Sequence, residues 1–460
     1  MNRDNRVSGS FRDPCGFLFF REGQLFRQVN TIYKDSYDLF MDSGLYQGLV
    51  KSGRLIPHIE TEVAPADPES CYKMIKPEFL EFISYPYEWS FSQLKDAALL
   101  TLAIQRKSLD FGMGLKDASA YNIQFKDGNP IFIDTLSFEK LKPGEPWVGY
   151  RQFCQHFLAP LALMSKTDIR LSKLLRTFID GIPLDLASQL LPTGTRLNMR
   201  LFAHLHLHAK SQKQHSGSPA KKPKGGMSKL ALIGLIESLI KTVENLKWRG
   251  TATEWGNYYQ DTNYSDTSFE KKHNQVRDYL QKAPHGMVWD LGANNGEFSR
   301  LASEMGRQTI AFDIDPVAVE HCYLRIKENK ETNLLPLIMD LTNPSPGIGW
   351  ENAERDSFIH RSKPTTVMAL ALIHHLAISN NLPLYRIGNF LANLAPWLII
   401  EFVPKSDSQV QRLLASREDI FPDYTEDGFQ ESFKYYYNLI ESQRVSGTER
   451  TLYLLQRRDS

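Results

Sequence analysis

The sequence predicts an α/β fold with a parallel β-sheet in the second half of the chain, preceded by a separate α+β domain. Short apolar segments end near residues 290, 313, 340, 373 and 401, and this recurrence of about 30 residues is the length of a βαβ unit. The segments are apolar throughout, as expected for strands covered by helices on both faces. The segment 211–227 is rich in Gly, Ser, Pro and Lys. It is therefore expected to be a flexible linker between residues 1–210 and 228–460.

The composition is that of an ordinary globular protein. The chain has 460 residues, more than one typical domain. The chain has 54 Lys and Arg residues and 53 Asp and Glu residues, which give a net charge of +1. This charge does not favour binding to nucleic acid, and no such partner is expected. The four cysteines are widely spaced, which fits a protein of a reducing compartment and does not suggest a metal site. No apolar stretch approaches the roughly 18 residues needed to span a bilayer, and we expect a cytoplasmic protein.

The first domain contains polar residues with a distinctive spacing. Asp117 is followed five residues later by Asn122, and Asp134 ends the next apolar segment. Carboxylate and amide oxygens suit Mg²⁺, and a short hairpin between Asn122 and Asp134 would bring them together. In the simpler alternative, Asp117 and Asn122 only cap turns of an accessory domain.

This spacing resembles the catalytic core of protein-kinase-like phosphotransferases. The resemblance implies that Asp117, Asn122 and Asp134 form a nucleotide and metal site, with ATP and Mg²⁺ as candidate ligands. However, the chain lacks a glycine-rich phosphate loop, a Val-Ala-Ile-Lys strand and an Asp-Phe-Gly sequence; Arg27 is a candidate substitute for the lysine. We therefore expect residues 1–210 to form a kinase-like accessory or acceptor-binding domain.

Three further segments lie between the first domain and the predicted sheet. His204, His206 and His208 would spread around a helix, so no metal site is expected there. Residues 230–246 have apolar side chains at helical spacing and are expected to pack on the sheet domain. The aromatic residues of segment 255–264 are expected to cover a ligand or to pack in the core.

Residues 288–299 predict a ligand-binding strand, loop and helix. An apolar strand carries Asp290, and Gly292 and Gly296 let the backbone turn sharply close to a ligand. A dinucleotide fingerprint would place glycine at positions 294 and 297, where this chain has Asn294 and Glu297. A pyrophosphate site is therefore not expected.

Each following strand also ends in a polar residue. Because ligands of parallel sheets bind beyond the carboxyl ends of the strands, these residues are expected to surround one site. A carboxylate at the end of the second strand can accept both hydroxyl groups of a ribose. The strand-end residues are Asp313, Asp340, His374 with His375, and Glu401. In the alternative interpretation, the acids only cap helices of a nucleotide-free domain.

The pattern Asp290-x-Gly292-x-x-x-Gly296, with acids at the next strand ends, resembles motif I of class I S-adenosylmethionine-dependent methyltransferases. The resemblance covers residues 250–460 and implies a Rossmann-like seven-stranded sheet closed by strands near 436–440 and 450–455. It also implies that S-adenosyl-L-methionine is the cofactor, with Asp313 at the ribose and Asp340 at the adenine amine. The implied cofactor-binding residues are Asp290, Gly292, Ala293, Asn294, Gly296, Asp313, Ile314, Asp340, Leu341 and Leu370.

The catalytic candidates are His374 and His375, at the mouth of the fourth strand. Adjacent residues leaving a strand point in opposite directions, so we expect only one to face the site, and we favour His375. No Asn-Pro-Pro-Tyr sequence follows this strand, which argues against N6-adenine and glutamine methyltransferases. An oxygen acceptor is therefore preferred.

The whole chain is similar in plan to rhizobial nodulation-associated methyltransferases and, with reversed domain order, to bacterial kinase-methyltransferases that cap surface polysaccharides. Both resemblances imply a glycan or glycolipid acceptor. Together with the preferred oxygen acceptor, they favour O-methylation of a small molecule, carbohydrate or glycolipid. A bifunctional kinase-methyltransferase acting on a surface glycan, a protein or RNA methyltransferase, and a non-enzymatic interaction protein remain as alternatives.

Overall fold

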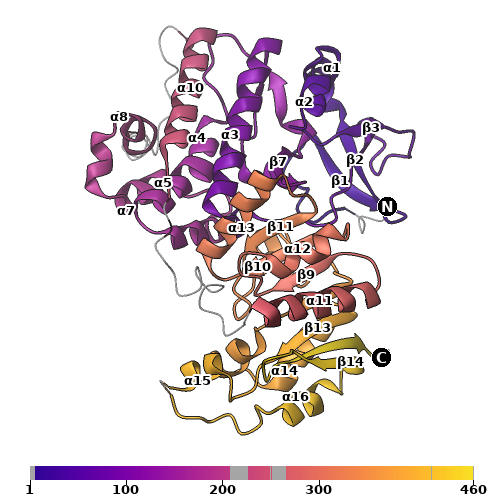
Figure 1. Cartoon of the computed structure of the whole chain (residues 1–460). Helices are drawn as coiled ribbons and strands as arrows, with labels where there is room; N and C mark the ends of the chain where they lie inside the picture. Colours follow the sequence, from indigo (N-terminus) through magenta and orange to yellow (C-terminus); the bar gives the residue numbers. More distant parts are fainter. Residues whose placement is uncertain (1–5, 208–225, 249, 251–265, 416, 459–460) are drawn as a thin grey trace. The chain divides into compact units, whose positions relative to one another are not determined.

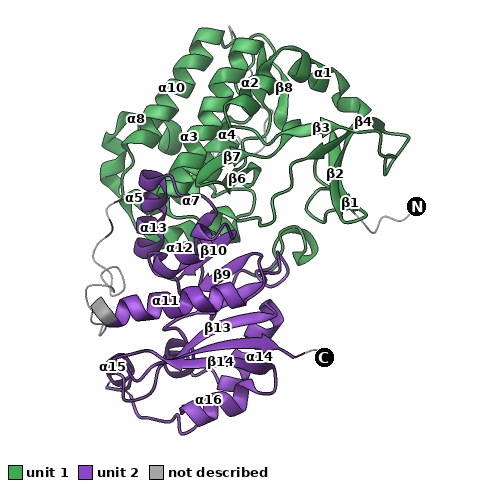
Figure 2. Ribbon diagram, turned by 45° about the vertical axis from the view of Figure 1, so that its right-hand side comes forward, with its two compact units in different colours: residues 1–249, 346–356 green, residues 250–345, 357–460 purple. Residues whose placement is uncertain are grey.

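The chain is a mixed α/β protein with two compact units. The computed structural model describes residues 6–207, 226–248, 250, 266–415 and 417–458 (Figure 1). Unit 1 contains residues 1–249 together with 346–356, and unit 2 contains residues 250–345 and 357–460 (Figure 2). Residues 211–225 of the predicted linker and the aromatic segment 255–264 lie outside the described residues.

Unit 1 begins with a four-stranded antiparallel sheet in the order β1-β2-β4-β3. The first hairpin turns at Glu22 and Gly23, whose φ angles of 50° and 74° suit a tight two-residue connection. Tyr33, Tyr37 and Leu136 form a buried core with residues of β2 and β4. The strands are β1 (Gly16–Arg21), β2 (Gln24–Asn30), β3 (His58–Glu60) and β4 (Cys71–Pro77).

The rest of unit 1 is mainly helical, with two small strand pairs, and the polar residues of the predicted nucleotide site lie in the segments next to these strands. The helix α3 begins with a capping box, in which Ser90 and Gln93 bond each other's backbone. The strand pairs are β5 (Met113–Leu115) with β8 (Phe138–Lys140), and β6 (Ile123–Lys126) with β7 (Asn129–Phe132). The helices include α1 (Lys34–Asp42), α2 (Leu45–Lys51), α3 (Phe91–Ser108), α4 (Tyr150–Phe153), α5 (Ala159–Lys166), α6 (Leu174–Thr177), α7 (Leu184–Leu190), α8 (Met199–Leu201) and α10 (Lys229–Asn245).

The helix α10 corrects one expectation from the sequence. It belongs to unit 1, where it packs against α3. Lys95 of α3 donates hydrogen bonds to the carbonyls of Glu244 and Leu246, at 2.8 and 2.9 Å. The apolar spacing showed that α10 needs an apolar partner, but it could not show which unit supplies that partner.

Unit 2 is built on a seven-stranded sheet in the order β11-β10-β9-β12-β13-β15-β14. The first five strands in chain order are parallel, whereas β15 is antiparallel to both β13 and β14. After β9, the chain adds β10 and β11 on one side of β9 and then β12 and β13 on its other side. The strand order therefore reverses at β9. The strands are β9 (Val288–Leu291), β10 (Thr309–Asp313), β11 (Leu334–Ile338), β12 (Thr366–Ala369), β13 (Trp397–Phe402), β14 (Tyr437–Arg444) and β15 (Thr451–Arg457).

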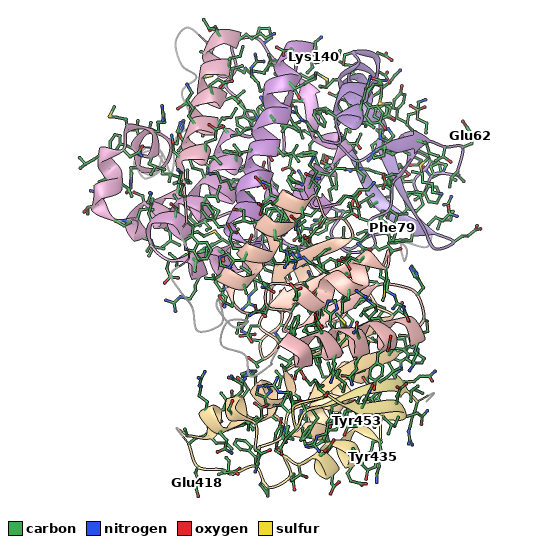
Figure 3. All side chains as sticks on the ribbon, viewed as in Figure 1. Glu62, Phe79, Lys140, Glu418, Tyr435 and Tyr453 are labelled. Atoms are coloured by element: carbon green, nitrogen blue, oxygen red, sulfur yellow. The ribbon has the colours of Figure 1, made fainter. Side chains whose placement is uncertain are left out.

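Helices cover both faces of this sheet, which explains why its central strands are apolar throughout. Val288 packs with residues of α11 and α12. Trp289, the next residue, points to the other face and contacts Phe358, which packs on Phe390 of α14. Tyr453 on β15 packs against α16 (Figure 3). The helices are α11 (Asp266–Lys282), α12 (Glu297–Glu304), α13 (Pro316–Asn329), α14 (Leu384–Leu394), α15 (Ser408–Leu414) and α16 (Glu426–Phe433).

Among the helices that the structure describes, none combines the length and the apolar character needed to cross a membrane.

Candidate functional site

A cavity of about 390 Å³ opens in unit 2 at the carboxyl ends of β9, β10, β11 and β12. This is the position where parallel sheets bind their ligands, and the volume lies within the ordinary range of small-molecule sites. Nine of the ten residues implied to bind the cofactor line this cavity; Gly296 does not. The lining residues among them are Asp290, Gly292, Ala293, Asn294, Asp313, Ile314, Asp340, Leu341 and Leu370.

The loop after β9 is held tightly against the neighbouring strand. The N–H groups of Gly292 and Ala293 both donate to the carbonyl of Phe312, at 2.8 and 2.9 Å. Gly292 and Gly296 have φ angles of 77° and 78°, which favour glycine. A Cβ at Gly296 would lie 2.6 Å from the sulfur of a cysteine on α13. Gly296 therefore permits close packing behind the cavity and does not face it.

Asp313 at the end of β10 is a buried carboxylate held by backbone donors. The N–H of Asn294 donates to Oδ2 at 2.7 Å, and the N–H of Asp315 donates to Oδ1 at 2.8 Å. Each oxygen keeps a further lone pair for a ligand hydroxyl group. Burial raises the pKa of Asp313 to about 6, although these backbone hydrogen bonds oppose the rise.

Asp290 on β9 is the second buried acid of the cavity. Its Oδ2 accepts a hydrogen bond of 2.6 Å from the hydroxyl of Ser299. Burial raises the pKa of Asp290 to about 7, and the negative charge of Asp313 adds to the rise. Two acids that resist ionisation side by side favour a ligand that brings positive charge.

The far end of the cavity is less buried and combines polar and apolar groups. Asp340 follows β11, and its Oδ1 accepts bonds from the N–H and the hydroxyl of Thr342, at 2.9 and 2.6 Å. Ile314 lines the cavity although the residue is 55% exposed. An exposed apolar side chain beside a carboxylate suits a flat heterocycle with an amino group.

His374 and His375 have different environments. His375 begins a π-helical turn (His375–Ser379) and lines the cavity. The N–H and the side-chain amide of Asn380 both donate to the His375 carbonyl, at 3.2 and 2.9 Å. Burial lowers the pKa of His375 to about 4, so its imidazole is neutral at physiological pH.

His374, in contrast, does not line the cavity and is 1% exposed. Neither of its ring nitrogens has a hydrogen-bond partner among the described residues. Burial lowers its pKa well below the ordinary value. The two imidazole rings lie beside each other, with centroids 4.1 Å apart, but only the His375 ring reaches the cavity. Of the two catalytic candidates, His375 is therefore the one that lines the cavity.

Other cavity-lining residues were not anticipated from the sequence. Lys272 and Phe269 come from α11, and Phe298 comes from the first turn of α12. Glu401, expected at the site, instead lies behind the wall, where it pairs with Lys272 at 2.8 Å. The remaining unanticipated lining residues are Met339, Thr342, Ala371, Leu372, Leu376, Ser379, Asn380 and Leu413.

Unit 1 brings Asp117, Asn122 and Asp134 close together. Asn122 donates a 3.2 Å hydrogen bond to the Ser137 hydroxyl, which in turn donates to Asp134. Burial raises the pKa of Asp117, and the charge of Asp134 adds to that rise. Asp134 also forms an ion pair with Arg27 of β2.

Arg27 changes the chemistry of this group. Burial opposes ionisation of Asp134, but Arg27 and Ser137 outweigh it and hold the pKa of Asp134 below its ordinary value. Among the described residues, no three His, Cys, Asp or Glu side chains converge in a way that could hold a metal ion. Two of the histidines excluded as ligands bond hydroxyl groups: His204 contacts Tyr150 and Ser238. His206 contacts hydroxyl groups of two further residues.

The segment 346–356, which follows β11 in the sequence, also belongs to unit 1. The Glu354 side chain is 2% exposed and accepts hydrogen bonds of 2.6 and 2.9 Å from Arg12. The Arg355 guanidinium lies 4.4 Å from the ring centroid of Tyr121, the residue before Asn122. No local pattern in the sequence indicated this packing.

Comparisons with known proteins place the chain among relatives. No protein-family model matches it. N-methyltransferase NodS from Bradyrhizobium japonicum WM9, in complex with S-adenosyl-L-homocysteine, is 11% identical, with 45% of this chain and 94% of that chain covered and a TM-score of 0.33. Magnesium protoporphyrin IX methyltransferase from Synechocystis PCC 6803 with bound SAH is 18% identical, with 44% and 92% covered and a TM-score of 0.32.

A curated relative is similar over almost its whole length. Nodulation protein NoeA of Rhizobium meliloti (strain 1021) is 36% identical over 464 residues, which cover 99% of this chain and 97% of the relative. With that identity over nearly the whole of both sequences, the chain belongs to the family of nodulation protein NoeA.

Proposed function

We propose that the protein is an S-adenosylmethionine-dependent methyltransferase. The observation that carries this proposal is the meeting of three strand-end carboxylates, Asp290, Asp313 and Asp340, in one cavity at the carboxyl edge of the sheet. The raised pKa values of Asp290 and Asp313 favour a cationic ligand. When bound, S-adenosylmethionine supplies an electrophilic methyl group on a sulfonium.

The three acids offer distinct contacts for such a cofactor. Asp313 can accept both ribose hydroxyl groups through the lone pairs that its backbone donors leave. Asp340, with Ile314 and the N–H of Leu341, can hold the adenine. Asp290 and the loop at Gly292 are left for the ammonium of the methionine moiety. The strand order of unit 2, with its reversed last strand, supports a methyltransferase-type Rossmann-like sheet.

The methyl acceptor is proposed to be an oxygen of a small molecule, a carbohydrate or a glycolipid. His375 is a neutral imidazole at the cavity, so it can take the proton that an acceptor hydroxyl loses as its oxygen forms the new bond to carbon. Asn380 fixes the turn that carries His375. The relative NoeA is named as a nodulation protein, and a role in nodulation is part of this proposal.

Unit 1 is proposed to be a kinase-like domain that binds the acceptor. The sheet order β1-β2-β4-β3 and the β6–β7 hairpin, which separates Asn122 from Asp134, support this interpretation. The Arg27 guanidinium already pairs with the Asp134 carboxylate, which a metal ion would need as a ligand. That ion pair disfavours the bifunctional kinase-methyltransferase alternative.

Calorimetry tests the cofactor assignment on the full chain. S-adenosylmethionine and its demethylated product should both bind the natural protein. Asp313→Ala removes the acceptor of two hydroxyl groups, and charge-assisted hydrogen bonds are worth about 1.5–3 kcal/mol, so affinity should fall at least roughly tenfold. Asp278→Ala, on an exposed part of α11, serves as the matched control. If neither compound binds the natural protein, the proposal is wrong.

A further inference from the structure

One side chain of the cavity, Lys272, has no part in the function proposed so far. Its side chain is 3% exposed, yet it lines the cavity. Lys272 is the only lysine or arginine among the described residues that line this cavity. A charged group so deeply placed is costly to bury, so its presence in a cavity wall calls for a physical reason.

The neighbours of Lys272 place its ammonium at one end of the cavity. Nζ donates to Oε2 of Glu401 at 2.8 Å, and the Glu401 side chain is fully buried behind the wall. Nζ also lies 4.8 Å from the ring centroid of Phe298, which lines the cavity just after the loop 292–296. Asp290 lies close enough for its charge to act on Lys272. The ammonium is therefore at the end of the cavity formed by β9 and its loop.

Stability alone does not explain this ion pair. Replacing a buried ion pair by apolar residues of similar size is often neutral or stabilising, because the desolvation of two charges offsets their attraction. The apolar neighbour of the ammonium is the ring of Phe298, which belongs to the buried cluster between α11 and α12. A ligand group with negative charge provides a reason, because a lysine ammonium can bridge two carboxylates.

We propose that Lys272, held by Glu401, binds the α-carboxylate of the cofactor's methionine moiety. This inference rests on the proposed function, which brings an amino acid with an ammonium and a carboxylate to the β9 end of the cavity. Asp290 attracts the ammonium, and Lys272 is the cation at the same end. The two residues together select a zwitterionic amino-acid group, whereas Asp313 and Asp340 hold the adenosine.

Paired ligands test the inference by calorimetry on the full chain. Decarboxylated S-adenosylmethionine keeps the sulfonium and the ammonium and lacks only the carboxylate. The natural protein should bind S-adenosylmethionine roughly tenfold to a hundredfold more tightly than the decarboxylated compound. Lys272→Met should lose about that factor for S-adenosylmethionine and change the affinity for the decarboxylated compound less than about twofold.

Two further variants keep the test independent of folding. Lys272→Met removes the ammonium that pairs with the buried Glu401, so the double variant Lys272→Met/Glu401→Gln is measured beside it. Lys271→Met, on the exposed neighbour, should leave both affinities unchanged.

The possible outcomes separate this inference from the proposed function. Equal losses for both ligands, or a loss of methyl transfer with unchanged cofactor affinity, would overturn the carboxylate contact and leave the methyltransferase assignment intact. The absence of binding of either ligand to the natural protein would overturn the proposed function and this inference with it.

Discussion

Replacing Asp290 by asparagine tests the charge balance of the cavity, because it removes a carboxylate that burial disfavours. The pKa of Asp290 rises from the ordinary value of 3.8 to about 7 in the folded chain. The folded state therefore holds this proton more tightly than the unfolded state, and stability falls as pH rises from about 4 to about 7. Asparagine has no such cost, and its carbonyl can still accept the hydrogen bond from Ser299.

The magnitude follows from these two pKa values. Relative to a side chain that does not ionise, the raised pKa of Asp290 lowers the free energy of unfolding by at most about 1.5 kcal/mol at pH 5 and about 4 kcal/mol at pH 8. Asp290→Asn should therefore stabilise the ligand-free protein, and by about 2.5 kcal/mol more at pH 8 than at pH 5. The same variant should bind S-adenosylmethionine more weakly, because it has lost a partner for the ammonium. The site thus gives up stability in exchange for affinity.

Hydrogen exchange in peptides that cover β9, measured at both pH values, gives the local opening free energy without assuming two-state unfolding of the whole chain. Asp278→Asn, on the exposed face of α11, is the control. A stabilisation that is equal at both pH values, or a net destabilisation, would refute the reasoning. Calorimetry in two buffers of different ionisation enthalpy should also show proton release when the natural protein binds the cofactor.

Two other predictions concern catalysis and the first unit. His375→Gln should lower the methyl-transfer rate with little effect on cofactor affinity, whereas His374→Gln should act through stability; a rate unaffected by His375→Gln would remove it from the mechanism. ATP with Mg²⁺ should not raise the melting temperature of the full chain, because Arg27 already neutralises Asp134. A clear Mg²⁺-dependent rise that Asp134→Asn abolishes would contradict this and favour the bifunctional alternative.

The sequence was most informative where one physical rule determines several residues at once. Strands buried on both faces must be apolar throughout, so the segment ending near Asp290 and the one ending at Asp313 could be located closely. Parallel strands place their carboxyl ends at one edge, which is why Asp290, Asp313 and Asp340 were expected together and are found lining one cavity. Gly292 was expected beside the ligand because it has no Cβ, and it lines the cavity with a φ angle of 77°.

Side chains contributed by distant elements could not be placed by such rules. Lys272 is an instructive case, because a lysine in a helix is normally assigned to the solvent face. Its position is three residues after Phe269 and four before Val276, on the apolar stripe of α11. A charged residue within an apolar stripe was the available signal. The pairing of Glu354 with Arg12 left no comparable trace, since it joins segments 342 residues apart.

The position of α10 leads to a last prediction about the boundary between the units. Composition located the polar segment 211–227, but it did not determine on which unit the following helix packs. The α10 side chains of Leu232, Ile236, Leu239 and Val243 are buried, and the helix packs on α3 of unit 1.

A fragment 228–460 would expose this apolar face to water. Such exposure costs about 25 cal/mol of free energy per Å² of apolar surface. We therefore expect the fragment to associate or to lose α10 to protease, whereas α10 in the full chain should resist cleavage. Mass spectrometry of limited digests distinguishes the two cases. Protection of α10 in the isolated fragment would mean that the helix finds an equivalent apolar partner on unit 2.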